Sequence, residues 1–120
     1  MAQNIFVEDM DGYTAVRLHG SLNSEEHSEE LRLEFKDLKK KEKKYVLVDF
    51  TNVSYINSSA IRGLLSGNAL VKKMDGRLAL YNLNEYNENI IKISNLHLEF
   101  KIFKNLSKAV HFLKTGEIEE

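Results

Sequence analysis

The most informative segment of the chain is Val48-Asp49-Phe50-Thr51-Asn52-Val53-Ser54-Tyr55-Ile56-Asn57-Ser58-Ser59-Ala60-Ile61-Arg62-Gly63-Leu64-Leu65. It begins with apolar, β-branched residues, which are typical of a buried strand. A short loop is expected next, and Ser58 and Ser59 then stand at the opening of an amphipathic helix. The first N–H groups of a helix lack partners within it, and its start is partly positive, so a hydroxyl or a phosphate is favoured there. The segment indicates a switch at the rim of an α/β domain more than an active site.

The composition is typical of one soluble globular domain. The chain has 120 residues, of which 42% are hydrophobic and 29% charged, and a chain of this length buries roughly two thirds of its unfolded surface. A net charge of -1 provides no overall field that would attract nucleic acid or an anionic membrane. The absence of cysteine excludes disulfides, thiolate metal sites and a cysteine nucleophile.

The sequence also bears on location. No apolar run approaches the ~20 residues that a membrane-spanning helix needs. The start, Met1-Ala2-Gln3-Asn4, lacks the basic and apolar regions of a signal peptide. We therefore expect a cytoplasmic protein, with neither a nucleic acid nor a membrane as a direct partner.

The first half of the chain predicts a hairpin followed by a helix. The predicted elements are a strand over residues 4–8, a turn over 9–12, a strand over 13–19, a loop over 20–24 and a helix to about residue 40. Alternation in the second strand places Val16 and Leu18 toward a core. Ser24 is a good N-terminal cap for the helix. The apolar positions of that helix are Leu31, Leu33, Phe35 and Leu38.

The second half predicts strands that alternate with helices. The expected elements are a strand over residues 45–50, a helix from about Ser58 to 75–76, a strand over 77–81, a helix over 84–94, a strand over 100–103, a helix over 106–113 and a flexible tail over 114–120. The strand over 45–50 is apolar almost throughout, which fits a central strand covered on both faces. This alternation predicts a single α/β domain with a mixed sheet.

Enzymatic and metal chemistry find little support in the sequence. The four histidines, His19, His27, His97 and His111, have no spacing suited to metal ligands. No arrangement of nucleophile and base can be named, and we expect no cofactor. The run of lysines over residues 39–44 follows a predicted helix, where cations are favoured; a solvated helix end is expected, with nucleic-acid or membrane contact as the alternative.

Two segments carry a family resemblance. They are Asp49-Phe50-x-x-Val53-x-Tyr55-Ile56-Asn57-Ser58-Ser59-Ala60-Ile61 and, upstream, Val16-Arg17-Leu18-His19-Gly20-Ser21-Leu22-Asn23. The first resembles the signature of STAS domains, specifically bacterial anti-sigma factor antagonists, and the second is similar to that family's strand and following loop. The order of elements agrees over roughly residues 4–113. The resemblance implies one STAS-type domain, a mixed sheet with helices packed mainly on one face.

The resemblance also implies a function. In this family a serine at the position of Ser58 is phosphorylated by a partner kinase that is also an anti-sigma factor. The unphosphorylated antagonist binds the anti-sigma factor and frees the sigma factor, and phosphorylation breaks the complex. Because the kinase brings the ATP, no catalytic apparatus is implied in this chain. The implied partners are an anti-sigma factor serine kinase and, in addition, a serine phosphatase.

The expected partner-binding surface departs from the family pattern at several positions. Its residues are Asn23, Asn57, Ser58, Ser59, Ala60 and Arg62. Asn57 and Asn23 stand where the family usually has Asp, and Ala60 where it commonly has glycine. Fewer carboxylates ease the electrostatic cost of adding a phosphate, but they also weaken contacts that a kinase expects. A STAS scaffold without a phosphorylation switch is therefore the alternative function, and an enzyme is the third.

Each of these residues also has a plain structural interpretation. Ser58 and Ser59 are of the type that commonly caps a helix, and a structural role is favoured for Ser59. Asn57 can orient the loop through an Asx-type hydrogen bond. Arg62 is either a partner contact or an ordinary solvated residue.

Overall fold

The computed structural model describes residues 4–22 and 24–118. Its strands are β1 (Ile5–Asp9), β2 (Thr14–Leu22), β3 (Tyr45–Ile56), β4 (Arg77–Tyr81) and β5 (Lys101–Phe103). Its helices are α1 (Glu25–Lys40), α2 (Ser58–Lys73), α3 (Glu85–Ile93), the short 3-10 helix η1 (Leu96–Leu98) and α4 (Leu106–Thr115). The predicted elements are all present in the predicted order.

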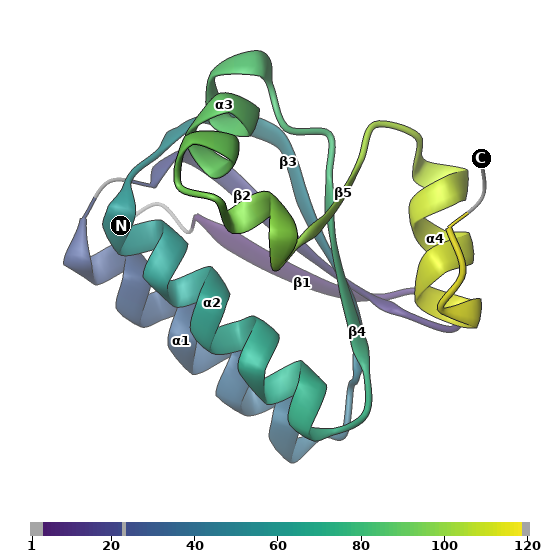
Figure 1. The fold of residues 1–120 in the computed structure, drawn as a ribbon. Coiled ribbons are helices and arrows are strands. Elements are labelled where there is room, and N and C mark those ends of the chain that lie inside the picture. The colour runs from purple at the N-terminus through teal and green to yellow at the C-terminus, as the bar shows by residue number, and fades with distance from the viewer. Residues whose placement is uncertain (1–3, 23, 119–120) are drawn as a thin grey trace.

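The strands form one mixed sheet in the order β1-β2-β3-β4-β5 (Figure 1). The β1–β2 pair is antiparallel, and the other three pairs are parallel. Each parallel pair needs a crossover connection, and α1, α2 and α3 with η1 supply them. The predicted α/β domain with a mixed sheet is confirmed.

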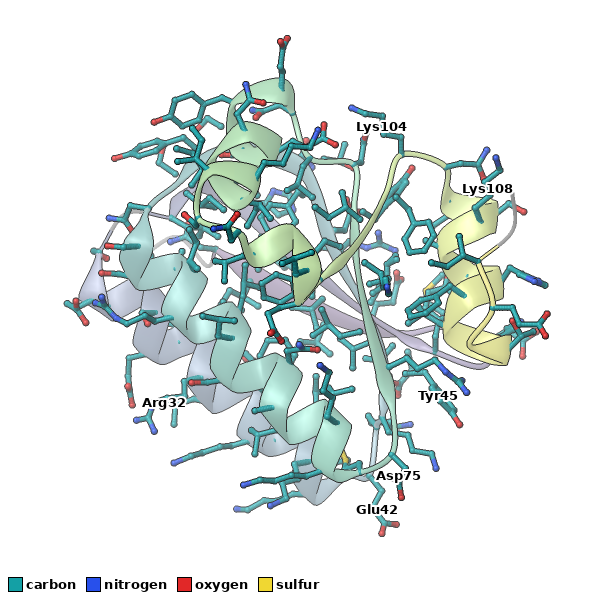
Figure 2. All side chains as sticks on the ribbon, viewed as in Figure 1. Arg32, Glu42, Tyr45, Asp75, Lys104 and Lys108 are labelled. Atoms are coloured by element: carbon teal, nitrogen blue, oxygen red, sulfur yellow. The ribbon has the colours of Figure 1, made fainter. Side chains whose placement is uncertain are left out.

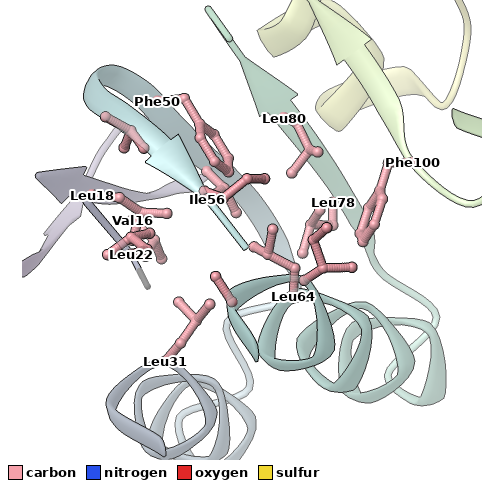
Figure 3. Close-up of a cluster of buried hydrophobic side chains, with 14 of the residues drawn as sticks. Val16, Leu18, Leu22, Leu31, Phe50, Ile56, Leu64, Leu78, Leu80 and Phe100 are labelled. Atoms are coloured by element: carbon pink, nitrogen blue, oxygen red, sulfur yellow. The ribbon is translucent and has the colours of Figure 1, made fainter. Parts of the chain in front are cut away.

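Three helices lie on one face of the sheet and α4 lies on the other (Figure 1). The larger core joins β2, β3 and β4 to α1, α2 and α3. Figure 3 shows part of it, with Val16 and Leu18 on β2, Leu31 on α1 and Leu64 on α2. The smaller core joins β3 and β4 to α4 through Leu47, Ala79, Ala109, Phe112 and Leu113. The prediction of helices mainly on one face is therefore confirmed, and β3 is covered on both faces as expected.

Close contact between α1 and α2 depends on a small residue. Gly67 of α2 lies against the ring of Phe35 in α1, and a Cβ at position 67 would overlap that ring. Leu31 and Phe35 are 1% exposed and Leu38 is 2% exposed, whereas Leu33 is 53% exposed. The expectation that Leu33 belongs to the apolar face was wrong, because residues 31, 35 and 38 already share one side of the helix.

The strands next to the helix openings are longer than predicted. β3 continues through the expected loop to Ile56, and β2 continues through the expected loop to Leu22. The two strands pair along this extension with a register shift between Gly20 and Ser21. Buried side chains at Val53 and Ile56 anchor the extension to the core, which explains why polar neighbours do not end the strand.

The opposite end of the molecule carries the lysine run. α1 ends at Lys40 with Lys39 and Lys40 in its last turn, and α2 ends with Lys72 and Lys73. Figure 2 shows Glu42 and Asp75 in the turns that follow these two helices. Lys39, Lys40 and Lys41 are all exposed, as expected for a solvated helix end whose dipole favours cations.

The C-terminal helix is slightly longer than predicted. α4 continues to Thr115 and ends at Gly116, which has a φ of 79°. A left-handed residue at this position is typical of a helix end, and glycine adopts that conformation without steric cost.

Candidate functional site

The candidate site is built where β3 runs directly into α2. Ile56 is the last residue of the strand, and Asn57 is the N-cap of the helix in an extended conformation. The side-chain oxygen of Asn57 accepts hydrogen bonds from the backbone N–H groups of Ser59, at 3.0 Å, and Ala60, at 3.3 Å. Asn57 therefore caps the helix. The Asx-type hydrogen bond expected for it is confirmed, and capping by the serines was wrong.

Ser58 is the first residue of α2 and is exposed. Its hydroxyl makes no hydrogen bond with any residue in the described part of the chain. Capping by Asn57 explains why the Ser58 hydroxyl has no partner, because the backbone N–H groups that a capping serine would bind already donate to Asn57. A group added to the Ser58 oxygen would project into solvent at the positive end of the helix.

Ser59 has a different environment from its neighbour. It is 8% exposed, and its hydroxyl donates a hydrogen bond of 3.0 Å to a carboxylate oxygen of Glu25 in α1. Ala60 is 1% exposed and packs in the larger core. Their burial leaves Ser59 and Ala60 little surface for contact with another protein. Ser59 instead ties the first turn of α2 to the first turn of α1.

Arg62 joins the same small network. Its Nη2 group donates to the Glu25 carboxylate at 2.8 Å and to the Ser59 hydroxyl at 3.2 Å. Both charged side chains are largely exposed, Arg62 at 61% and Glu25 at 80%. An ion pair this open to water is strongly screened. The structure thus places Arg62 at the surface beside the start of α2, in an ion pair that can exchange partners at little cost.

The first turn of α2 carries no negative charge of its own. The first turn of α2 has no acidic residue, whereas α1 has Glu25 and Glu26 and α3 has Glu85 and Glu88. Acidic residues usually stabilise a helix start. Because α2 has a neutral cap and no carboxylate in its first turn, its partial positive charge is not compensated from within the helix.

Sequence reasoning missed the residues that hold β3 in place next to the site. Asn87 of α3 is fully buried; its side chain accepts from the backbone N–H of Ile56 at 3.0 Å and donates to the carbonyl of Val53. Asn84 caps α3 and donates to the carbonyls of Val53 and Ser54. The available signal was a polar Asn87 next to the apolar positions of a short helix. Such a residue is costly to bury without partners.

An aromatic pair lies next to the same end of β3. The rings of Tyr55 and Tyr86 meet edge to face with their centroids 6.2 Å apart, and Tyr86 is 54% exposed. Exposed tyrosines are enriched in protein interfaces, because a rigid ring contributes much contact area at low entropic cost. The sequence alone did not connect these two tyrosines. Asn23, which was expected at this surface, lies outside the described residues.

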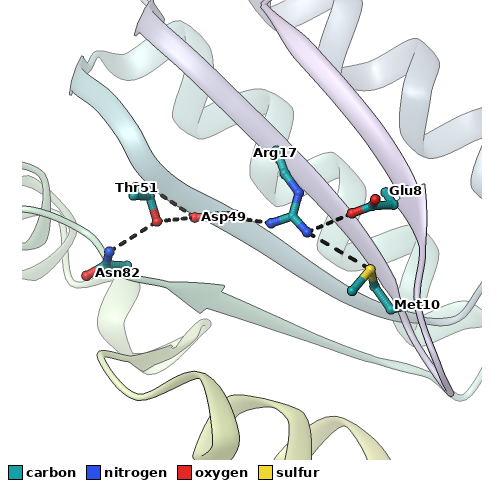
Figure 4. Close-up of polar contacts among 6 residues, drawn as sticks. All are labelled: Glu8, Met10, Arg17, Asp49, Thr51 and Asn82. Carbon is teal, nitrogen blue, oxygen red and sulfur yellow. Dashed lines mark hydrogen bonds and ion pairs between the residues drawn. The ribbon is translucent and has the colours of Figure 1, made fainter.

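A second polar cluster lies on the sheet face against which α4 packs (Figure 4). Arg17 donates to Glu8 at 2.8 Å and to Asp49 at 2.9 Å. The hydrogen bond to Glu8, together with that to Asp49, raises the pKa of the Arg17 guanidinium despite partial burial. The other oxygen of Asp49 accepts from the backbone N–H and the hydroxyl of Thr51. Both carboxylate oxygens are thus engaged, so this cluster fastens β1, β2 and β3 together.

The described residues include neither a metal-binding cluster nor a membrane-spanning helix. No three His, Asp or Glu side chains there come together in a way that could hold a metal ion. None of the helices in this part of the chain is long and apolar enough to cross a membrane.

Comparison with known proteins gives the family. The model of the STAS domain matches residues 4–109. The chain belongs to the STAS domain family. A comparison with curated proteins found no match.

Solved structures with the fold of this STAS domain include several anti-sigma factor antagonists. A putative antagonist from Thermotoga maritima has a TM-score of 0.84 at 19% identity and covers 92% of this chain and 94% of its own. An antagonist from Mycobacterium paratuberculosis has a TM-score of 0.80 at 17% identity and covers 92% of each chain. The anti-sigma factor antagonist SpoIIAA in its unphosphorylated form has a TM-score of 0.70 at 16% identity and covers 89% of this chain and 94% of its own. These structures share the fold with the present STAS domain.

Proposed function

We propose that this STAS domain is an anti-sigma factor antagonist that works by partner switching. Unphosphorylated, it binds an anti-sigma factor that is also a serine kinase, which releases a sigma factor and permits transcription. Phosphorylation of Ser58 by that kinase breaks the complex, and a serine phosphatase restores it. The role places the protein in the cytoplasm and requires no catalytic group in this chain, because the kinase brings the ATP.

One observation supports this proposal above all others. The Ser58 hydroxyl is exposed at the first turn of α2 and makes no hydrogen bond within the described residues, whereas Ser59 beside it is buried and bonded to Glu25. A kinase can therefore reach the first hydroxyl and not the second. Similarity of fold to SpoIIAA, which has also been solved in a phosphorylated form at a TM-score of 0.69 and 17% identity, agrees with this assignment.

The size of the electrostatic effect explains how one phosphate would act as a switch. A phosphoserine carries about -1.5 to -2 charges. In the free protein the helix start stabilises it by ~0.3–1 kcal/mol, and by up to about 2 kcal/mol when partly buried. At a closed interface an unmatched charge costs about 2–5 kcal/mol. Since each ~1.4 kcal/mol is tenfold in affinity, binding falls roughly 30-fold to several thousandfold while the fold stays intact.

The proposed docking surface surrounds Ser58. Asn57 directly precedes Ser58, and Arg62 lies one helical turn after it. Asn23 belongs to the surface by the family resemblance. We add Tyr86 as an aromatic anchor, since its exposed ring lies against Tyr55 at the end of β3. Ser59 and Ala60 are buried beneath this surface and help to hold the start of α2 in place.

Phosphorylation in a defined mixture tests the proposal. The protein is incubated with ATP and each histidine-kinase-like anti-sigma factor of the source organism, and intact mass and peptide mapping are measured. We expect one added phosphate, on Ser58. Ser58→Ala abolishes it, and Ser59→Ala, the matched control, retains it. A phosphate on another residue contradicts the proposal.

The second candidate function is a STAS scaffold without a switch. Asn57 favours it, because the side chain that precedes Ser58 acts as a neutral helix cap and offers a kinase no carboxylate. A stable assembly that contains unmodified Ser58, with no phosphate added by any of the anti-sigma factors, would support the scaffold. Native mass measurement of the purified assembly distinguishes the two.

A further inference from the structure

Ser58 and Arg62 occupy the same side of α2. They are four residues apart at the start of one helix, and residues at this spacing are neighbours on the helix surface. Both side chains are exposed. An arginine one turn after a serine can reach any group that is attached to the serine oxygen.

The present contacts of Arg62 are incomplete. Its Nη2 group serves both Glu25 and Ser59, and its Nη1 and Nε groups make no hydrogen bond within the described residues. A guanidinium presents five N–H donors in a planar fork that matches phosphate oxygens in pairs. Arg62 therefore has unused donors of the kind that bind a phosphate bidentately.

Glu25, which now accepts from Arg62, would compete only weakly with a phosphate for that side chain. Glu25 carries one negative charge and is 80% exposed, so water screens its attraction to Arg62. A phosphoserine carries about -1.5 to -2 charges and three acceptor oxygens. Hydrogen bonds between arginine and phosphate are charge-assisted and frequently bidentate. A phosphate on Ser58 would also repel the Glu25 carboxylate.

We propose that Arg62 exchanges Glu25 for the phosphate when Ser58 is phosphorylated, and so holds the phosphate within α2. The inference rests on the proposed modification of Ser58. The exchange removes Arg62 from the surface offered to a partner at the moment when the new charge appears there. It also leaves the Ser59 hydroxyl as the remaining contact of Glu25 in the network that joins α1 to α2.

The titration of the phosphate itself tests the exchange. Phosphoserine is placed at position 58 during translation, so the sample does not depend on any kinase, and its second pKa is measured by phosphorus NMR. A nearby cation favours the dianion and lowers that pKa. We expect the value in the parent to lie about 0.5 units below that in Arg62→Gln, roughly threefold in the acid dissociation constant.

Two further variants control this measurement. Arg32 is a partly exposed arginine paired with Glu29 within α1, and Figure 2 shows it on the outer side of that helix. Arg32→Gln should leave the phosphate titration unchanged. Glu25→Gln removes the competing carboxylate and should lower the pKa further. Circular dichroism of each variant confirms that it is folded.

Equal titration of the phosphate in the parent and in Arg62→Gln would overturn the inference. That result would leave the proposed function standing, since the switch needs the phosphate and not the exchange. Conversely, failure of the anti-sigma factors to phosphorylate Ser58 would count against the proposed function, whereas the titration of the encoded phosphoserine would still report on Arg62. Each experiment can therefore refute one of the two proposals without deciding the other.

Discussion

Replacing Asn57 by alanine should destabilise the protein at the start of α2. The Asn57 side-chain oxygen accepts two backbone hydrogen bonds at the start of α2, from Ser59 and Ala60. Removing an N-cap of this kind costs about 0.5–2 kcal/mol. For a domain of 120 residues, each kcal/mol corresponds to about 4 °C in the unfolding midpoint. We expect the midpoint of Asn57→Ala to fall by roughly 2–8 °C.

Thermal and urea unfolding, followed by circular dichroism, measure the loss. Asn57→Asp is the matched control, because aspartate caps a helix as well as asparagine does; it should unfold like the parent. It also restores the carboxylate that the family usually has before the serine. If Asn57→Ala were as stable as the parent, the hydrogen bonds seen at the start of α2 would not hold that helix start in place.

Two further substitutions test the packing and the electrostatics of α1. Gly67→Ala should destabilise the protein by about 1–3 kcal/mol in urea unfolding, since the added methyl overlaps the ring of Phe35. The control is Ser66→Ala, at the exposed position next to it. Equal stability of the two variants would contradict the close α1–α2 contact. Burial, followed by the charge of Asp37, raises the pKa of Glu34 above 4.5, so the folded protein carries this carboxylate at a cost at neutral pH. Glu34→Gln should therefore raise the unfolding midpoint at pH 7. The gain should disappear as the pH falls below about 4.3, where the carboxyl is protonated in the folded and the unfolded protein alike. A gain that persists at low pH would show that the charge of Glu34 is not its cause.

Much of the fold was predictable because its signals are local. Ser24 caps α1 as its residue type suggests, and α2 begins at Ser58, where the apolar spacing changes from that of a strand to that of a helix. The strand over residues 77–81 coincides with β4. In each case neighbouring residues supply both the start signal and the apolar periodicity.

The missed features depend on contacts between distant residues. Polar residues after Phe50 suggested a loop, yet β3 continues because Asn84 and Asn87, some thirty positions later, satisfy its backbone. Leu33 was assigned to the core because apolar residues cluster around it, but helix geometry turns it to solvent. No pattern within a short segment contains this information.

The candidate site shows the same division. The place of Ser58 at the opening of α2 was indicated by the sequence. The ion pair between Arg62 and Glu25 joins two helices and could not be read from either one. The different environments of Ser58 and Ser59, which the proposed function depends on, likewise appear only when α1 and α2 are packed together.

The affinity of the protein for its anti-sigma factor, measured with serine and then with phosphoserine at position 58, provides the sharpest test of the proposed function. We predict tight binding of the serine form and binding at least roughly 30-fold weaker for the phosphoserine form, from the cost of burying the excess negative charge of the phosphate in a closed interface. Equal affinity of the two forms would contradict the account, because position 58 would then lie away from the docking surface.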